Sequence, residues 1–420
     1  MWKKPENPIP LGDHQLVVGV FVWINKPWSD HDFILNKFRI TTEQQLKQVV
    51  ALGKDNVYWF PSKSTAKPKP PTPTPEIPPS PPPAPEIDQH AERLREKTEQ
   101  LQRQRAQISK AERNWENAAK ATREAILGMR DNPKQAGGKM REFTQEAVQS
   151  VGGSEALLHL LGSKQGDGMQ HHALNCMSLA ILLAKRMGLP NAAISEIALG
   201  ALSHDIGKTL IPTHILRSKA RTRHEESLYR DHCMRGVELA RISGSFSEGA
   251  IAAIQDHHER LDGSGFPNSK KGAAIGLAAR IVATVNYYDR LCSPESPERD
   301  SMSPGEALKK MWREEQSRLD PAVLTALIKL LGVYPPGTLV GLSDGSLGLV
   351  VSPGQQSLLP KVLIYDSEVA RDEAPILDLS EIRDLAIEET LRAEEIPPDV
   401  LEWINPRERL IYYFSSTIDE

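Results

Sequence analysis

The chain has 420 residues and a mass of 46.6 kDa, which is more than one compact domain usually contains. Hydrophobic residues make up 39% and charged residues 25%, as in water-soluble globular proteins, although 32 prolines are more than such a fold needs. The net charge of −4 provides no basic field, so the composition argues against partners that are nucleic-acid polymers or anionic membranes.

Several features predict where the protein works. The longest apolar run, residues 16–24, is shorter than the roughly 20 residues that a membrane span takes. Residues 1–5 lack the apolar run of a secretory signal. We therefore expect no membrane span and a cytoplasmic location. Cys176, Cys233 and Cys292 are widely spaced, and we expect them to be reduced packing residues.

Residues 1–62 are predicted to form a small N-terminal α+β domain. The run 16–24 is rich in β-branched and aromatic residues and indicates a strand, as does the shorter run 56–60. Between them, residues 42–52 have helical spacing, begin at the capping residue Thr42 and end at Gly53.

The next two segments are predicted to connect this domain to the rest of the chain. Twelve of the 32 prolines fall between residues 61 and 85, so residues 63–87 should be an extended linker or, alternatively, a ligand for a proline-binding domain. Residues 88–135 are charged and helix-forming. One apolar residue recurs at every seventh position: Leu94, Leu101, Ile108 and Trp115. This stripe allows either a homodimer or docking within the chain.

Residues 136–335 have predominantly helical spacing and are predicted to be a large helical core. In residues 336–420 the pattern changes to short apolar runs, two of which flank Asp344-Gly345, a dipeptide that favours a hairpin turn. The predicted fold class is therefore mainly α, with the small N-terminal α+β domain and a C-terminal β appendix.

Histidines are concentrated in the predicted helical core. Nine of the twelve histidines lie between residues 159 and 258, including the pairs His204-Asp205 and His257-His258. Asp205 has two oxygens with which to bridge two cations, and neutral imidazoles supply nitrogen ligands; the candidates are His172, His204, His232, His257 and His258. A nitrogen and oxygen set without thiolate suits Mn or Fe. Two such ions are typical of hydrolases that cleave phosphodiesters.

Two further features belong with these histidines. Lys208 follows Asp205 by three positions and His204 by four, so in a helix all three share a face, where the ammonium would neutralise a phosphate. The segment from Asp262 to Pro267 contains Gly263 and Gly265, which allow close approach of the backbone to a ligand.

The order of these motifs resembles the HD-GYP domain over roughly residues 145–335. The resemblance rests on His204-Asp205-Ile-Gly-Lys208, on His257-His258-Glu259 and on Asp262-Gly263-Ser-Gly265-Phe266-Pro267. It extends to His172, sixteen residues before Gly188, and to His232, four before Gly236.

The resemblance implies an all-helical metallohydrolase that hydrolyses cyclic di-GMP to linear pGpG, to GMP or to both, with two divalent transition metal ions, Fe or Mn. The implied metal ligands are His172, His204, Asp205, His232, His257, His258 and the residue at position 286, which is Asn286; the implied catalytic residues are His204, Asp205 and Lys208. The implied substrate contacts are Lys208, Asp262, Gly263, Gly265, Phe266, Pro267 and Arg299. The loop from Gly263 to Pro267 also implies diguanylate cyclase (GGDEF) domains as partners.

The chain departs from the family pattern at several positions. Asn286 stands where the family has an aspartate ligand, Gly168 where some members have a glutamate for a third ion, and Phe266 where the motif has tyrosine. Residues 292–300 are acidic and offer only Arg299 where the family often has an arginine-rich stretch. We therefore expect two metal ions at most. A weakened member that binds cyclic di-GMP or a cyclase, and hydrolysis of another cyclic dinucleotide, are the alternative functions.

Five further residues receive other interpretations. Register favours His172 over the adjacent His171 as the ligand, and His214 and His224 are predicted to lie on the surface. We expect Asp289 to orient a ligand or cap a helix, and Glu259 to make hydrogen bonds behind the ligands.

Overall fold

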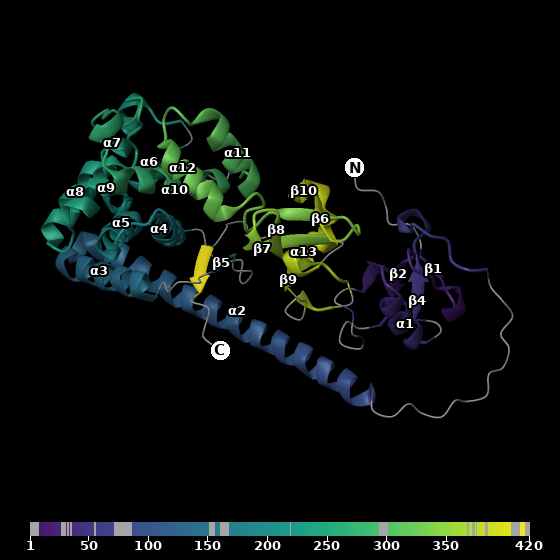
Figure 1. The fold of residues 1–420 in the computed structure, drawn as a ribbon. Helices are drawn as coiled ribbons and strands as arrows, with labels where there is room; N and C mark the ends of the chain where they lie inside the picture. The colour runs from purple at the N-terminus through teal and green to yellow at the C-terminus, as the bar shows by residue number, and fades with distance from the viewer. Residues whose placement is uncertain are drawn as a thin grey trace.

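The computed structural model describes residues 8–26, 36–53, 56–70, 86–150, 156–159, 168–218, 220–293, 301–367, 376–382, 385–404 and 412–415, together with 31, 33, 369–371 and 374. Figure 1 shows its helices gathered at one end of the molecule, a sheet in the middle and a second sheet at the other end. Among the described residues, every helix is too short or too polar to cross a lipid bilayer.

The N-terminal unit is an antiparallel sheet with one helix. The strands are β1 (Ile9–Pro10), β2 (Phe21–Ile24), β3 (Lys37–Arg39) and β4 (Val57–Trp59), in the order β1-β4-β2-β3, and the helix is α1 (Glu43–Ala51). The Thr42 side chain caps α1 by accepting from the Gln45 backbone N–H. The strand predicted over residues 16–24 is shorter than expected, because Gly19 turns the chain with φ of 99° and β2 begins only at Phe21.

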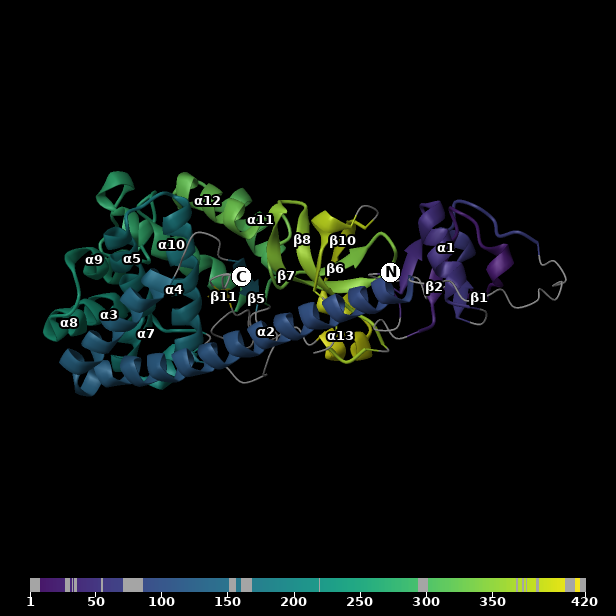
Figure 2. The ribbon, with the colours of Figure 1, turned by 60° about the horizontal axis from the view of Figure 1, so that its bottom comes forward.

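Two helices lead into the helical body. The helix α2 (Glu86–Asp131) is 46 residues long and runs beside the middle sheet in two views (Figures 1 and 2), and α3 (Pro133–Ser150) follows it. The side chains of Leu94, Leu101 and Ile108 lie outside the described residues, so the predicted dimer stripe stays a prediction there. Trp115 is buried among side chains of the helical body.

Among the described residues, the helical body has nine further helices. They are α4 (Met169–Arg186), α5 (Asn191–Ser203), α6 (Thr213–Arg217), α7 (Arg223–Arg230), α8 (His232–Ser243), α9 (Glu248–Asp256), α10 (Leu277–Cys292), α11 (Pro304–Glu314) and α12 (Pro321–Leu331). All but α6 and α7 contribute side chains to one apolar core. The helix α4 is buried on nearly all sides, from His171 to Ala184, because α2, α5, α10 and α12 all contact it. Asp320 caps α12 and also pairs with Arg280.

The C-terminal unit is a five-stranded antiparallel sheet in the order β10-β6-β7-β8-β9. Its strands are β6 (Leu339–Leu342), β7 (Leu347–Gln356), β8 (Leu359–Ile364), β9 (Ile376–Asp378) and β10 (Ile387–Leu391), and the helix α13 (Pro398–Ile404) packs against it. The hairpin between β6 and β7 turns at Gly345, where φ is 83°. The Lys63 ammonium of the N-terminal unit donates to the Asp344 carbonyl at this turn.

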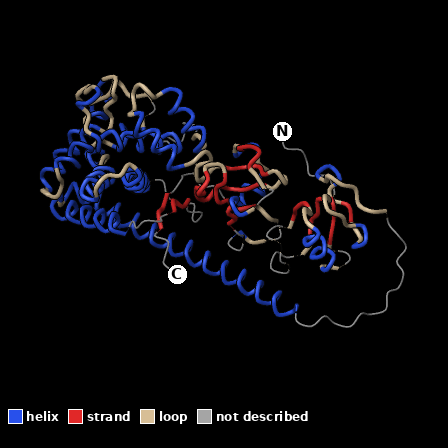
Figure 3. The backbone as a smooth tube through the Cα atoms, viewed as in Figure 1, coloured by secondary structure: helices blue, strands red, loops and turns tan. Residues whose placement is uncertain are grey.

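The strand content is separate from the helical body except at one point (Figure 3). There β5 (Ala156–His159) pairs antiparallel with β11 (Tyr412–Ser415), far along the chain. The prediction of a helical core with small strand-containing units toward both ends is confirmed. The β5–β11 pair was not predicted, since its two strands lie on either side of the core in sequence.

Candidate metal centre

The predicted ligands come from the ends of short helices that meet inside the helical body. His204 follows the last residue of α5, and Asp205 precedes the 3-10 turn Ile206–Leu210. His232 opens α8, His257 and His258 follow α9, and His172 lies in the first turn of α4. Helix ends leave backbone carbonyls without helical partners. These carbonyls are therefore available to orient the histidine rings.

Three of the histidines are held by such a carbonyl through Nδ1. The bonds run from His204 to Ala201 (2.7 Å), from His232 to Tyr229 (2.6 Å) and from His257 to Ile254 (2.8 Å). Because a carbonyl only accepts, Nδ1 carries the proton in each ring, and Nε2 keeps its lone pair. The three Nε2 atoms face one another and Asp205, which is the orientation of metal-binding imidazoles.

His172 is held in the same way by a carboxylate. Its Nδ1 donates to Asp289 Oδ2 over 2.6 Å, and Asp289 Oδ1 accepts from Asn175 Nδ2 over 2.7 Å. The His172 Nε2 therefore points inward and lies 3.0 Å from His204 Nε2. The geometry assigns Asp289 the orienting part that the sequence suggested.

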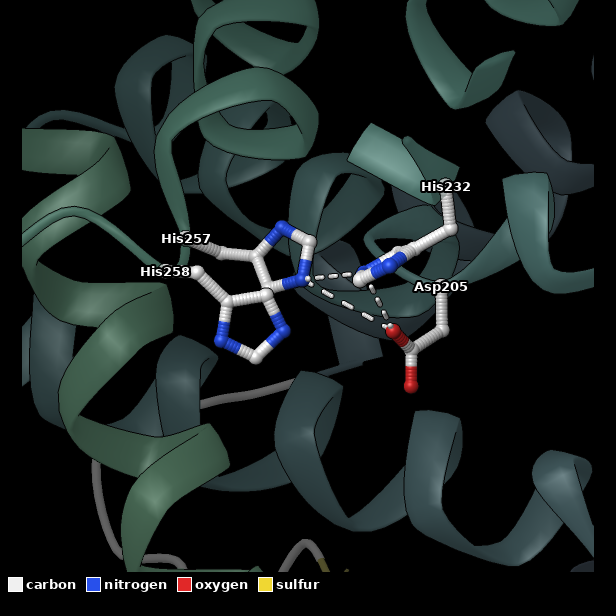
Figure 4. A group of neighbouring side chains, drawn as sticks. All are labelled: Asp205, His232, His257 and His258. Atoms are coloured by element: carbon white, nitrogen blue, oxygen red, sulfur yellow. Dashed lines mark hydrogen bonds and ion pairs between the residues drawn. The ribbon is translucent and has the colours of Figure 1, made fainter. Parts of the chain in front are cut away.

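Asp205 joins two groups of side chains. Asp205, His232, His257 and His258 place one ligand atom each within 4.8 Å of one another, as do His172, Cys176 and His204 in the second group. Figure 4 shows the first group, with the His232 and His257 rings directed at an Asp205 oxygen. Asp205 Oδ1 and His258 Nε2 are buried and have no hydrogen-bond partner among the described residues. Unpaired acceptors at that depth fit a bound cation.

Two cationic side chains contact the other Asp205 oxygen, Oδ2. Lys208 Nζ is 2.9 Å from Asp205 Oδ2, and Arg290 Nη2 donates to the same atom over 2.7 Å. Burial by itself opposes ionisation of Asp205, but Lys208 and hydrogen bonds from His204 and His257 outweigh it and hold the pKa well below its ordinary value. The carboxylate is therefore charged at neutral pH and available as a ligand.

Four of the site histidines are neutral at the same pH. Burial lowers the pKa of His172 and of His232 to about 3 and that of His257 to about 4, from the ordinary value of 6.5. Burial also holds the pKa of His258 well below that value. A neutral imidazole is the form that binds a metal ion, so these rings need no deprotonation first.

The loop after His258 is fixed against the centre. Buried Glu259 accepts from the backbone N–H groups of Asn268 and Lys270, over 2.6 and 3.0 Å, so these bonds hold the loop rather than a ligand. Gly265 has no room for a side chain, because a Cβ there would lie 2.5 Å from the His258 carbonyl oxygen. The Phe266 ring stacks on the His258 ring with centroids 4.4 Å apart. The loop thus covers one side of a predicted ligand.

The other predicted site residues lie differently. Asp262 accepts hydrogen bonds from Ser264 within the loop and from Arg318 Nε, 3.4 Å away, just before α12. Asn286 is buried on α10, and its Oδ1 has no hydrogen-bond partner among the described residues. Arg299 lies outside the described residues. His171 accepts a hydrogen bond from Trp115 Nε1 over 3.2 Å, so it faces α2 while its neighbour His172 faces the centre.

Sequence reasoning missed Arg290. Its signal was its position, four residues after Asn286 on a predicted helix, which places both residues on one face. An arginine beside a buried carboxylate becomes recognisable only once α10 and the His204-Asp205 turn are placed together. Cys176 was predicted to be a packing residue; it is buried, and its Sγ lies 3.8 Å from both His172 ring nitrogens. The three cysteines form no disulfide.

Comparison with known proteins agrees with this geometry. Residues 156–323 match the family model described as HD domain, and residues 13–138 match a domain of unknown function, DUF3391. A cyclic di-GMP phosphodiesterase of Pseudomonas aeruginosa is 35% identical over 224 residues, 53% of this chain and 53% of that protein.

Two further relatives have the same range of identity. The cyclic di-GMP phosphodiesterase response regulator RpfG of Xanthomonas campestris is 35% identical, covering 39% of this chain and 44% of that protein. A 3'3'-cGAMP-specific phosphodiesterase of Vibrio cholerae is 34% identical, covering 38% and 37%. The chain thus matches about half the length of these relatives or less. Residues 156–323 are an HD domain, and the resemblance predicted from the sequence is confirmed for this part of the chain.

Proposed function

We propose that the chain is a metal-dependent phosphodiesterase that hydrolyses cyclic di-GMP. The observation that carries the proposal is the convergence of four imidazole Nε2 atoms and the charged Asp205 carboxylate at one buried point. Each imidazole is oriented through its other nitrogen, so the arrangement is prepared for a cation before one arrives.

Four residues of such a centre would hold the metal ion. Asp205 Oδ1, His232, His257 and His258 would hold a divalent ion, and the absence of a thiolate from this group suits Mn or Fe. An ion held there lowers the pKa of a water molecule and withdraws charge from a phosphodiester. If two ions bind, as the sequence analysis expects, the second ion would lie beside His172 and His204.

Lys208 and Arg290 are the cationic side chains that would stabilise a substrate phosphate. Lys208 and Arg290 place positive charge beside Asp205, where the negative charge of a phosphodiester increases during attack. Buried Lys208 also lies over the Tyr229 ring, 5.4 Å from its centroid, which fixes the direction of the ammonium. Phe266, stacked on His258, would exclude bulk water from the ligand side of the loop.

The substrate assignment draws on the relatives, which are named for cyclic di-GMP in two cases and for 3'3'-cGAMP in the third. We propose cyclic di-GMP, with linear pGpG or GMP as product, and keep 3'3'-cGAMP as the second substrate to be tested. Diguanylate cyclase domains, approached through the loop from Gly263 to Pro267, and a second copy of the chain are the proposed protein partners.

The test is turnover by the full chain. The protein is loaded with Mn²⁺, or with Fe²⁺ without oxygen, and incubated with cyclic di-GMP or 3'3'-cGAMP, and the nucleotides are separated by chromatography. We expect linear product from cyclic di-GMP and a loss of at least about 100-fold in Asp205→Asn, which keeps the shape of the side chain but removes its charge. The exposed His224→Gln variant, on α7, is the matched control.

A different result would assign a different function. Binding of cyclic di-GMP by calorimetry without turnover under either metal would contradict the enzyme and indicate a receptor. Turnover of 3'3'-cGAMP alone would keep the reaction and change the substrate. Equal turnover in Asp205→Asn and the wild type would place the chemistry elsewhere in the chain.

A further inference from the structure

The two oxygens of Asp205 have different surroundings. Oδ1 lies 3.4 Å from His232 Nε2 and 3.7 Å from His257 Nε2, and it has no hydrogen-bond partner among the described residues. Oδ2 lies 3.4 Å from His204 Nε2 and 3.7 Å from His172 Nε2. The carboxylate therefore separates one half of the centre, with His232, His257 and His258, from another, with His172 and His204.

Both neighbouring cations lie in the second half. Lys208 Nζ and Arg290 Nη2 contact Oδ2 at 2.9 and 2.7 Å, and their contacts with Asp205 are to this oxygen. A divalent ion bound between His172, His204 and Oδ2 would lie within a few ångströms of two positive charges. Like charges that close repel strongly in a buried site, where water screens them little.

The second half also lacks a carboxylate of its own. Asp289 is engaged with His172 Nδ1 and Asn175. Asn286 precedes Arg290 by one helical turn and offers a neutral amide oxygen, buried without a partner among the described residues. The first half has the opposite character, since Asp205 Oδ1 and three imidazoles lie within mutual reach and Oδ1 has no hydrogen-bond partner among the described residues.

Arginine is suited to act in place of a cation. The Arg290 side chain is 22% exposed and extends from solvent to the buried carboxylate. Its guanidinium is charged at every physiological pH and presents N–H groups in a planar fork that matches carboxylate and phosphate oxygens.

We propose that the Arg290 guanidinium replaces a second metal ion, so that the centre binds one divalent ion tightly, through Asp205 Oδ1, His232, His257 and His258. Arg290 holds Asp205 Oδ2 in the other half and presents positive charge to a substrate phosphate there. The inference rests on the proposed function for the presence of the first ion, and it proposes one ion where the sequence analysis expected two.

The experiment counts ions without measuring activity. The full chain is stripped with a chelator, equilibrated with Mn²⁺, desalted and analysed for manganese per chain, and its electron paramagnetic resonance spectrum is recorded. We expect one Mn²⁺ per chain with the six-line signal of an isolated ion. In Asn286→Asp/Arg290→Met we expect two ions per chain and the broadened signal of a spin-coupled pair.

Single variants and a control complete the test. Asn286→Asp alone, which leaves the guanidinium in place, should stay at one tightly bound ion per chain. Two tightly bound ions in this variant would overturn the inference even if Arg290→Met fails to fold. Arg290→Lys should stay at one ion because the charge is kept. Arg241→Met, which removes an exposed arginine from α8, should also stay at one.

Three other results would overturn the inference. Two tightly bound ions in the wild type would show that Arg290 does not exclude the second. One ion in the double variant would show that something other than Arg290 and Asn286 sets the number. No bound ion in the wild type would contradict the metal centre itself, and with it the proposed function.

Discussion

Four of the inward histidines are fixed through the ring nitrogen that faces away from the centre. Three use a carbonyl three residues earlier, and His172 uses Asp289. The direction of a ring is therefore determined by its own helix end, whereas the meeting of the rings depends on tertiary packing. A single ligand can therefore be recognised from its local sequence, whereas the other ligands that it meets in the folded protein cannot.

The stability of the metal-free protein should depend on pH through these rings. The pKa of His257 is lowered by burial to about 4, from 6.5 in the unfolded chain. Between these values the unfolded chain binds a proton that the folded chain does not, so the free energy of unfolding falls as pH falls below 6.5 and is constant for this group above it. Each such histidine contributes about 1.4 kcal/mol per pH unit in that window.

Urea unfolding of the chelator-treated protein at pH 7.5, 6 and 5 measures this slope. His257→Gln should flatten it, and the exposed His224→Gln should leave it as in the wild type. The same slope in His257→Gln and the wild type would mean that His257 takes up its proton equally in the folded and unfolded states.

At the residue scale, site residues could be predicted where the spacing between residues in the sequence indicates their role. The concentration of histidines and the His204-Asp205 pair indicated a metal centre, and register to Gly188 selected His172 rather than His171, which contacts Trp115. Arg290 could not be assigned, because its bond to Asp205 joins residues 85 positions apart. No local pattern specifies such a contact.

At the scale of elements, Gly207 fixes how two ligand-bearing segments meet. The turn Ile206–Leu210 lies so close to α8 that a Cβ at Gly207 would be 1.9 Å from the His232 carbonyl oxygen and 2.6 Å from the Gly236 nitrogen. These neighbours are backbone atoms, which cannot rotate away. Asp205 and His232 are therefore held at a fixed separation by backbone contact.

Gly207→Ala should force these segments apart. We expect a loss of about 2–4 kcal/mol in the free energy of unfolding, because the overlap cannot be relieved without a backbone shift. Chemical denaturation measures the loss, and Mn²⁺ titration should show weaker binding. Gly138→Ala on α3, where a Cβ meets nothing within 4 Å, is the matched control and should be neutral or slightly stabilising. Equal stability of Gly207→Ala and the wild type would contradict the close contact.

The element predictions succeeded where periodicity is long. Helices such as α4 and α10 have apolar residues at helical spacing over several turns, and the hairpin of β6 and β7 was marked by Asp344-Gly345. The predicted strand over residues 16–24 was too long, since composition alone does not show that Gly19 turns the chain. The β5–β11 pair could not be predicted, because neither short apolar run indicates which strand it pairs with.

At the scale of the whole molecule, α2 connects the N-terminal part of the chain to the helical body. Near its C-terminal end Trp115 is buried and donates its indole N–H to His171, one residue before His172. The two rings are also nearly parallel, with an angle of 20° between their planes. The long helix is thereby attached to the first turn of the helix that carries a predicted ligand.

Trp115→Phe should weaken this attachment. It removes the hydrogen bond to His171 and part of the buried ring, so we expect a loss of about 1–3 kcal/mol in the free energy of unfolding. Thermal and urea unfolding measure it. Trp312→Phe is the matched control, because Trp312 is 47% exposed and should change stability little. Equal effects of the two substitutions would mean that the contact with His171 adds nothing.

The pairing of β5 with β11 has a consequence for how the chain is made. His159 lies opposite Tyr412, so β5 leaves the ribosome about 250 residues before its partner. At roughly 5–20 residues per second that interval is on the order of 10–50 s. Throughout this time the backbone groups of β5 that will pair with β11 have water as their partner, while the helices that follow β5 are already free to collapse around the histidines. The ligand-bearing core therefore has time to form before the small sheet at its border can close.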